Sequence, residues 1–179
     1  MLTASPRLAQ KAPGMRAMSA LALFTLFHVL LSVAAIGLGG AVAYGLLNGR
    51  RMGRMTIAFL VATAATTLTG FLFPFHGFTP ALGVGIVSSV VLVLAVIARY
   101  RFRMTGAWRA IYITSAFVAF YLNCFVFVAQ AFQKVPALHA LAPLGDEPPF
   151  AAVQALVLAG FLVTGWLALK RFRWDLARA

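Results

Sequence analysis

Residues 111–150 decide the fold of this chain. Residues 111–132 read IYITSAFVAFYLNCFVFVAQAF, a long apolar run that includes the polar residues Asn123 and Gln130. Residues 133–150 read QKVPALHALAPLGDEPPF and contain two of the chain's three acidic residues. An apolar run of this length predicts a helix that crosses a membrane. Outside this stretch the chain repeats the same pattern of apolar runs joined by short connectors, most of which are basic.

The composition predicts that the solvent of this protein is a lipid bilayer. Of its 179 residues, 63% are hydrophobic and 10% are charged, whereas about a quarter of the residues of a soluble domain are charged. The formal charge is +12. Because Arg and Lys lie between apolar runs, the predicted partners are anionic lipid headgroups, and nucleic acid is not expected. The single cysteine, Cys124, excludes a disulfide within one chain.

The expected fold is all-α, a bundle of five transmembrane helices in one domain over residues 19–170. The predicted spans are about 20–47, 55–73, 81–98, 108–132 and 150–169. Residues 1–18 are expected to form a polar basic tail, because they include Pro6 and Pro13. Residues 133–149 form an outer loop, in which Pro136 predicts the start of a short surface helix. Residues 171–179 form a basic cytoplasmic tail.

The basic residues predict the orientation of the bundle. Five spans place the two termini on opposite sides of the membrane. Four basic residues fall on the N-terminal side: Arg7, Lys11, Arg16 and Lys134. The other eleven fall on the C-terminal side: Arg50, Arg51, Arg54, Arg99, Arg101, Arg103, Arg109, Lys170, Arg171, Arg173 and Arg178. Since cytoplasmic loops are enriched in Lys and Arg, the N-terminus is predicted outside and the C-terminus inside.

With this orientation, the histidines lie in the outer half and are the candidate cofactor ligands. His28 belongs to a polar stripe with Thr25 and Ser32 on the first span. Ionisable groups within a membrane are costly and often functional. One interpretation is a haem, metal or quinone site formed by His28 with His76 or His139. The alternative is a neutral His28 bonded to Asn123 or to a backbone carbonyl, with no cofactor.

Small and polar residues predict where helices meet. Gly37, Ala41 and Gly45 recur at every fourth position, which makes a groove for another helix of this chain or of a partner. Gly37 also begins the GLGG run that is the easiest place for the long first span to bend. Asn123 and Gln130 lie seven residues apart, which favours interhelical hydrogen bonds or, alternatively, the lining of a polar cavity.

The outer loop also contains charged residues that are candidates for a role. Lys134 begins this loop, and Asp146 and Glu147 end it. Acidic residues before a helix complement its dipole, and proline suits the first turn, so a structural role accounts for residues 146–149. A metal site made with His76 or His139 is the alternative, although the spacing matches no recognised metal motif.

Two stretches resemble a known group of proteins. They are TGFLFPFHGFTP, residues 69–80, and FYLNCFVFVAQAFQKVPALHALAPLGDEPPF, residues 120–150. Over most of spans two to five, the chain is similar to small bacterial membrane proteins to which no activity is assigned. This resemblance implies a location in the bacterial inner membrane and draws attention to the loop that begins at Lys134. It implies no particular chemistry.

The leading functional hypothesis is a non-enzymatic accessory or interaction subunit, which binds a membrane-protein partner or forms a homo-oligomer. The sequence shows no Ser-His-Asp grouping and no glycine-rich phosphate motif. No Asp or Glu lies within a predicted span, although coupled carriers commonly need a carboxylate at that depth. The alternatives are a redox protein that binds a cofactor or quinone at His28, and a small oligomeric channel or carrier.

Overall fold

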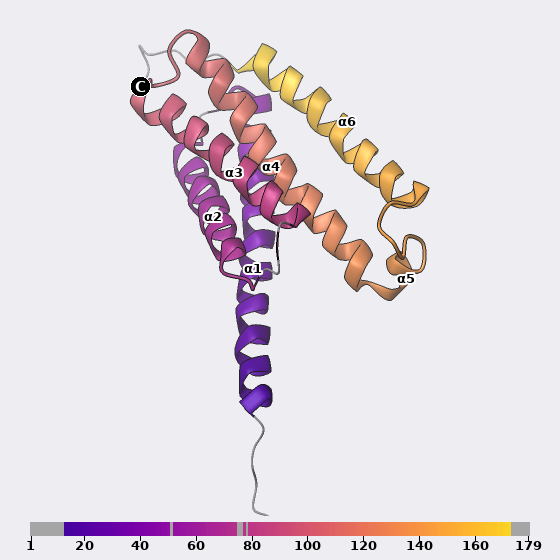
Figure 1. Ribbon diagram of the computed structural model, residues 1–179. Helices are drawn as coiled ribbons and strands as arrows, with labels where there is room; N and C mark the ends of the chain where they lie inside the picture. Colours follow the sequence, from indigo (N-terminus) through magenta and orange to yellow (C-terminus); the bar gives the residue numbers. More distant parts are fainter. Residues whose placement is uncertain (1–12, 51, 75–76, 78, 173–179) are drawn as a thin grey trace, which may run out of the picture.

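The computed structural model describes residues 13–50, 52–74, 77 and 79–172, with side chains from residue 20 onward. Its described elements are all helical (Figure 1). They are α1 (Pro13–Leu47), α2 (Gly53–Phe71), α3 (Pro80–Val96), the π-helical turn η1 (Ile97–Arg101), α4 (Ala107–Lys134), α5 (Pro136–His139) and α6 (Pro148–Arg171). The short helix predicted at Pro136 is confirmed as α5.

Five of these helices are long and apolar enough to cross a membrane, which confirms the predicted number of spans. The candidate spans are Ala20–Leu47, Gly53–Phe71, Pro80–Arg101, Ala107–Lys134 and Pro148–Arg171. Many of their large apolar side chains face outward; Leu23, for example, is 69% exposed and Leu156 is 74% exposed. Such a surface is unfavourable in water and favourable in lipid, as expected of a multi-pass membrane protein.

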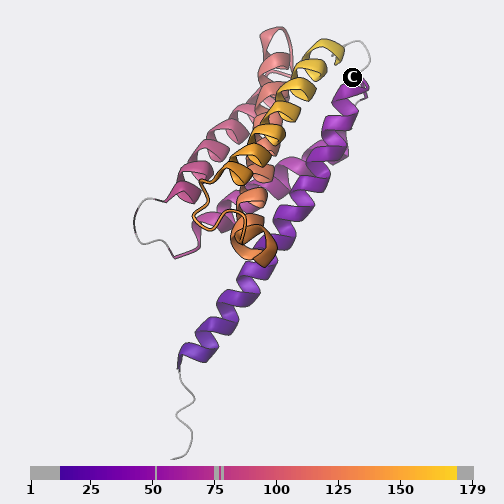
Figure 2. The ribbon, with the colours of Figure 1, turned by 90° about the vertical axis from the view of Figure 1, so that its right-hand side faces the viewer.

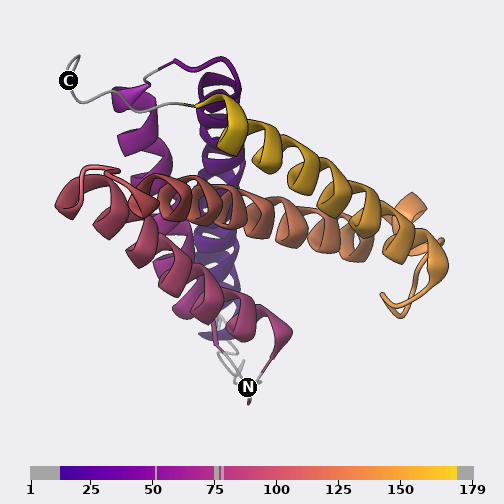
Figure 3. The ribbon, with the colours of Figure 1, turned by 90° about the horizontal axis from the view of Figure 1, so that it is seen from above.

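Helix α4 is the centre of the bundle. It packs against α1, α2, α3 and α6. Seen from above, it crosses α1 and α2 with α3 on one side and α6 on the other (Figure 3). Its buried face alternates large and small residues, and Tyr112, Ile113 and Ala119 have no exposed surface. The small residues on this face allow several helix backbones to approach α4 closely.

Helix α1 differs from the sequence prediction at its N-terminal end. It begins at Pro13, so residues 13–18 are helical although a loose tail was predicted; proline is well tolerated in the first turn, where its missing N–H has no helical partner. Residues 1–12 lie outside the described part. Helix α1 is also continuous through residues 37–40, the stretch where the sequence predicts that it bends most easily. There Gly39 allows close approach of the Phe120 ring, because a Cβ atom at residue 39 would lie 2.5 Å from Phe120 Cδ2.

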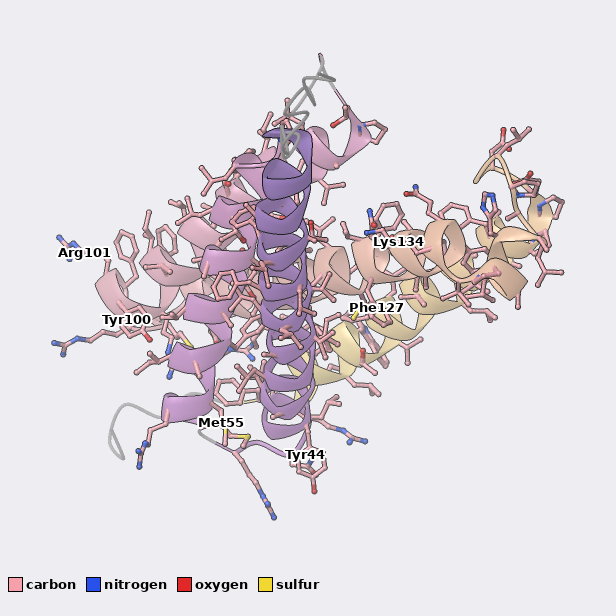
Figure 4. All side chains as sticks on the ribbon, turned by 90° about the horizontal axis from the view of Figure 1, so that it is seen from below. Tyr44, Met55, Tyr100, Arg101, Phe127 and Lys134 are labelled. Atoms are coloured by element: carbon pink, nitrogen blue, oxygen red, sulfur yellow. The ribbon has the colours of Figure 1, made fainter. Side chains whose placement is uncertain are left out.

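The two ends of the bundle differ in charge. We call the end where α1, η1 and α6 finish the basic end. Its described cationic residues are Arg50, Arg54, Arg99, Arg101, Arg103, Arg109, Lys170 and Arg171. In the view from below, Arg101 and Lys134 lie on opposite sides of the molecule (Figure 4). The N-terminal part of α1 extends past the other helices at the opposite end (Figure 2).

Candidate functional site

His28 binds the second helix of the bundle. Its Nδ1 atom lies 2.8 Å from Oγ1 of Thr69. The Thr69 hydroxyl also lies 2.8 Å from the carbonyl oxygen of Ala65 and 3.0 Å from that of Thr66. A hydroxyl has one proton, so the arrangement consistent with these distances has Thr69 donating to its own helix and His28 Nδ1–H donating to Thr69. In the neutral ring, Nε2 is then the unprotonated nitrogen.

An aromatic ring and a glycine also contact His28. The Phe73 ring meets the imidazole edge-on, with centroids 5.2 Å apart. A Cβ atom at Gly70 would lie 3.6 Å from His28 Cε1, an ordinary van der Waals distance, so the ring packs against α2 at this glycine. Nε2 has no hydrogen bond to any part of the chain that the structure describes.

The predicted bond between His28 and Asn123 is wrong. Asn123 Nδ2 instead donates to Thr63 Oγ1 at 3.2 Å, because α4 meets the middle of α2 while His28 meets its C-terminal end. Gln130, which the sequence placed on the same face, is exposed. Asn123 therefore makes the interhelical hydrogen bond expected of it, and a second amide that joins two helices is Gln154, whose Nε2 donates to the carbonyl of Phe125 at 3.1 Å.

The described structure does not bring the candidate ligand histidines together. His139 is exposed on α5, which packs only against α4, whereas His28 is on α1. His76 lies outside the described residues. Among the residues that are described, no group of three or more His, Cys, Asp and Glu side chains has the arrangement of a metal site.

Glu147 organises the outer loop. Its carboxylate accepts hydrogen bonds from the backbone N–H of Leu144 at 2.9 Å, Gly145 at 2.9 Å and Asp146 at 3.2 Å. These bonds lower the pKa of the Glu147 carboxyl below its usual value, and the bond from the Leu144 N–H has the largest effect. Glu147 precedes the first residue of α6 but turns back toward the loop rather than capping that helix. Asp146 and Lys134 are exposed.

The small residues predicted to form one face of α1 differ in their surroundings. Gly37 is exposed, and a Cβ atom there would have no neighbour within 4 Å. Ala41 is partly buried. Gly45 is buried, and a Cβ atom there would lie 2.5 Å from Met52 Sδ. The two ends of this face therefore differ: one is open to the surroundings and the other packs within the chain.

A second polar region lies at the basic end, where a partly open cavity of about 100 Å³ is lined by residues at or near the ends of five helices. Its apolar wall consists of Val42, Leu46, Met52 and Phe172, and its polar side chains are Arg50, Thr56, Arg99 and Tyr112. We call it the basic pocket. Tyr112 is fully buried, and its hydroxyl has no hydrogen-bond partner of acceptable geometry, although Thr56 and Arg99 lie beside it.

The π-helical turn positions Arg99 in this pocket. Wider turns of this kind are rare in proteins, but those that do occur often lie at functional sites. The Arg99 Cζ atom lies 5.4 Å from the centre of the Tyr112 ring and 5.7 Å from that of Tyr100. The neighbouring side chains of Tyr100 and Arg101 point away from the bundle (Figure 4). The turn therefore directs one of three closely spaced arginines, Arg99, toward the interior of the bundle.

The connector after η1 is tightly built. Arg103 and Met104 have φ of 48° and 55°, in the left-handed region, and Met104 is 2% exposed. Phe102 stacks on Trp108 with centroids 3.8 Å apart. Burial of Met104 and this stacking offset the cost of the unusual backbone.

Arg109 fixes the end of α6 beside the pocket. Its Nη1 donates to the carbonyl oxygens of Leu169, at 2.9 Å, and of Phe172. These bonds satisfy carbonyls that the end of a helix leaves without partners, and they hold Phe172 in the pocket wall.

Sequence reasoning treated the basic residues only as membrane anchors and therefore missed the basic pocket. The one available signal was the alternation Arg99-Tyr100-Arg101-Phe102-Arg103, which does not reveal which arginine turns inward. No family model, curated protein or solved structure matches this chain.

Proposed function

We propose that this is a non-enzymatic interaction subunit of a bacterial inner membrane, oriented with its N-terminus outside and its C-terminus inside. The partner surface is the open face of α1 around Gly37. The observation that supports the proposal most directly is that Gly37 is exposed and that a Cβ atom there would have no neighbour within 4 Å, so this stretch of the α1 backbone is uncovered. Lipid covers apolar side chains equally well, but a bare glycine also permits another helix to approach closely.

The test is a pair of matched glycine substitutions. Gly37→Leu adds a branched side chain to the proposed surface, and Gly160→Leu adds the same side chain to an open position of α6. Native electrophoresis of mildly solubilised membranes is expected to show a complex that Gly37→Leu removes and Gly160→Leu preserves. An unchanged complex with Gly37→Leu would overturn the proposal. Gly45→Leu is unsuitable because it collides with Met52 inside the chain.

A second candidate function, cofactor binding at His28, rests on a different observation. Ligand histidines commonly donate one ring N–H to a neighbouring group, which orients the ring and leaves the other nitrogen for the ligand. The bond from His28 Nδ1 to Thr69 has this form. The test is an absorption spectrum and metal analysis of protein purified in mild detergent. A haem band or stoichiometric metal that His28→Ala removes supports this candidate; a colourless, metal-free sample counts against it.

A further inference from the structure

We propose that the basic pocket binds a phosphate group at the cytoplasmic side of the protein, independently of any partner of α1. Two features of the pocket point to an anion. Arg99 and Arg50 line it, and the only carboxylates that the structure describes, Asp146 and Glu147, are in the loop at the opposite end. An anion from outside the described chain is therefore the group that would neutralise this charge.

The buried hydroxyl of Tyr112 specifies the ligand further. It is a donor with no exposed surface, and in the described part of the chain it has no hydrogen-bond partner of acceptable geometry, although Thr56 and Arg99 lie beside it in the pocket. Buried polar groups without partners are rare and costly, so a ligand that accepts a hydrogen bond here is favoured. Thr56, 3% exposed, contributes a second hydroxyl to the same cavity.

Size and chemistry favour phosphate. The cavity of about 100 Å³ exceeds the roughly 10–15 Å³ that a single water needs on the same measure. A phosphate presents several acceptor oxygens, which match the planar donors of arginine and the two hydroxyl groups. The phosphate belongs either to a lipid headgroup or to a small soluble molecule; the recognition chemistry is the same.

The π-helical turn gives the proposal a matched control. Arg99 faces the pocket, whereas Arg101, two residues later, points away from the bundle (Figure 4). Arg99→Gln and Arg101→Gln therefore remove the same charge from the same turn, but only the first removes a pocket donor. Tyr112→Phe removes the buried hydroxyl and leaves the ring, so that packing is retained.

The experiment combines native mass spectrometry with titration of inorganic phosphate, each on the full chain in mild detergent. If the source is a lipid, the wild type and Arg101→Gln retain one phospholipid that Arg99→Gln loses. If the source is soluble, inorganic phosphate raises the melting temperature of the wild type and Arg101→Gln but not of Arg99→Gln. In either case Tyr112→Phe weakens binding about tenfold, the loss expected for one hydrogen bond to a charged group.

Two results would overturn the proposal. One is that neither phospholipid nor inorganic phosphate binds the wild-type protein. The other is that Arg101→Gln reduces binding as much as Arg99→Gln, which would mean that the general positive charge of this end is responsible. The melting temperature of each variant without ligand shows whether it is folded.

Discussion

The imidazole of His28 in α1 and the hydroxyl of Thr69 in α2 lie 2.8 Å apart and join two helices across 41 residues of sequence. Because Thr69 also bonds to carbonyls of its own helix, the pair connects the side chain of α1 to the backbone of α2. In a bilayer, which offers few competing donors, such a bond contributes to the association of the two helices.

Thr69→Val should therefore weaken the contact between α1 and α2. The substitution preserves shape and removes the hydroxyl, and we expect a loss of about 1 kcal/mol in the free energy of unfolding. Thr164→Val is the control, because the Thr164 hydroxyl bonds only to carbonyls of its own helix. The measurement is denaturant unfolding in mild detergent; equal losses in both variants would show that the His28 bond contributes nothing specific.

Gly39→Ala should separate α1 from α4. The added Cβ atom would lie 2.5 Å from the Phe120 ring, which is closer than real contacts permit, and overpacking of this kind costs about 1–3 kcal/mol. Gly37→Ala has open space around it and should be neutral or stabilising, because alanine is the better helix former by about 1 kcal/mol. Unfolding curves of the two variants provide the comparison, and a stable Gly39→Ala protein would contradict this account of the packing.

The outer loop should lose order in acid. The pKa of Glu147 is lowered in the folded protein, mainly by the Leu144 N–H, so its contribution to stability is present above the unfolded pKa. That contribution disappears as pH falls through the folded value, because the protonated carboxyl accepts these bonds less well. The protection factors of the amides at residues 144–146, which correct for the pH dependence of intrinsic exchange, are expected to fall below the usual carboxyl pKa of 4.5.

Glu147→Gln should show faster exchange in this loop even at neutral pH, and a smaller change on acidification. Asp146→Asn is the control, since the exposed Asp146 side chain is not the acceptor of these bonds. A wild-type loop whose exchange pattern keeps the same protection from neutral to acid pH would refute the role assigned to Glu147.

The topology has its own test. With the basic end in the cytoplasm, alkaline phosphatase fused after the last residue should be inactive and green fluorescent protein fused there should be fluorescent. An active phosphatase would show that the orientation is the reverse of the one proposed. It would also place the basic pocket on the other side of the membrane.

The sequence alone determined the fold class and the number of spans. Long apolar runs separated by basic or Pro- and Gly-containing connectors have one low-energy form in lipid, because a helix satisfies its own backbone hydrogen bonds. The same local chemistry identified the short helix at Pro136. The same reasoning was wrong at Pro13, because the effect of a proline depends on whether it begins a helix or interrupts one.

Only the tertiary structure decided which polar residues meet. His28 pairs with Thr69 rather than Asn123, and Arg99 turns inward while Arg101 turns out. Helical periodicity gives the face of each residue within its own helix, but partners on other helices depend on crossing angles and on the relative depth of each helix. The π-helical turn changes that face locally, because it adds a residue to one turn of the helix. Arg99 comes from this turn, and the other residues of the basic pocket come from segments that are distant in the sequence.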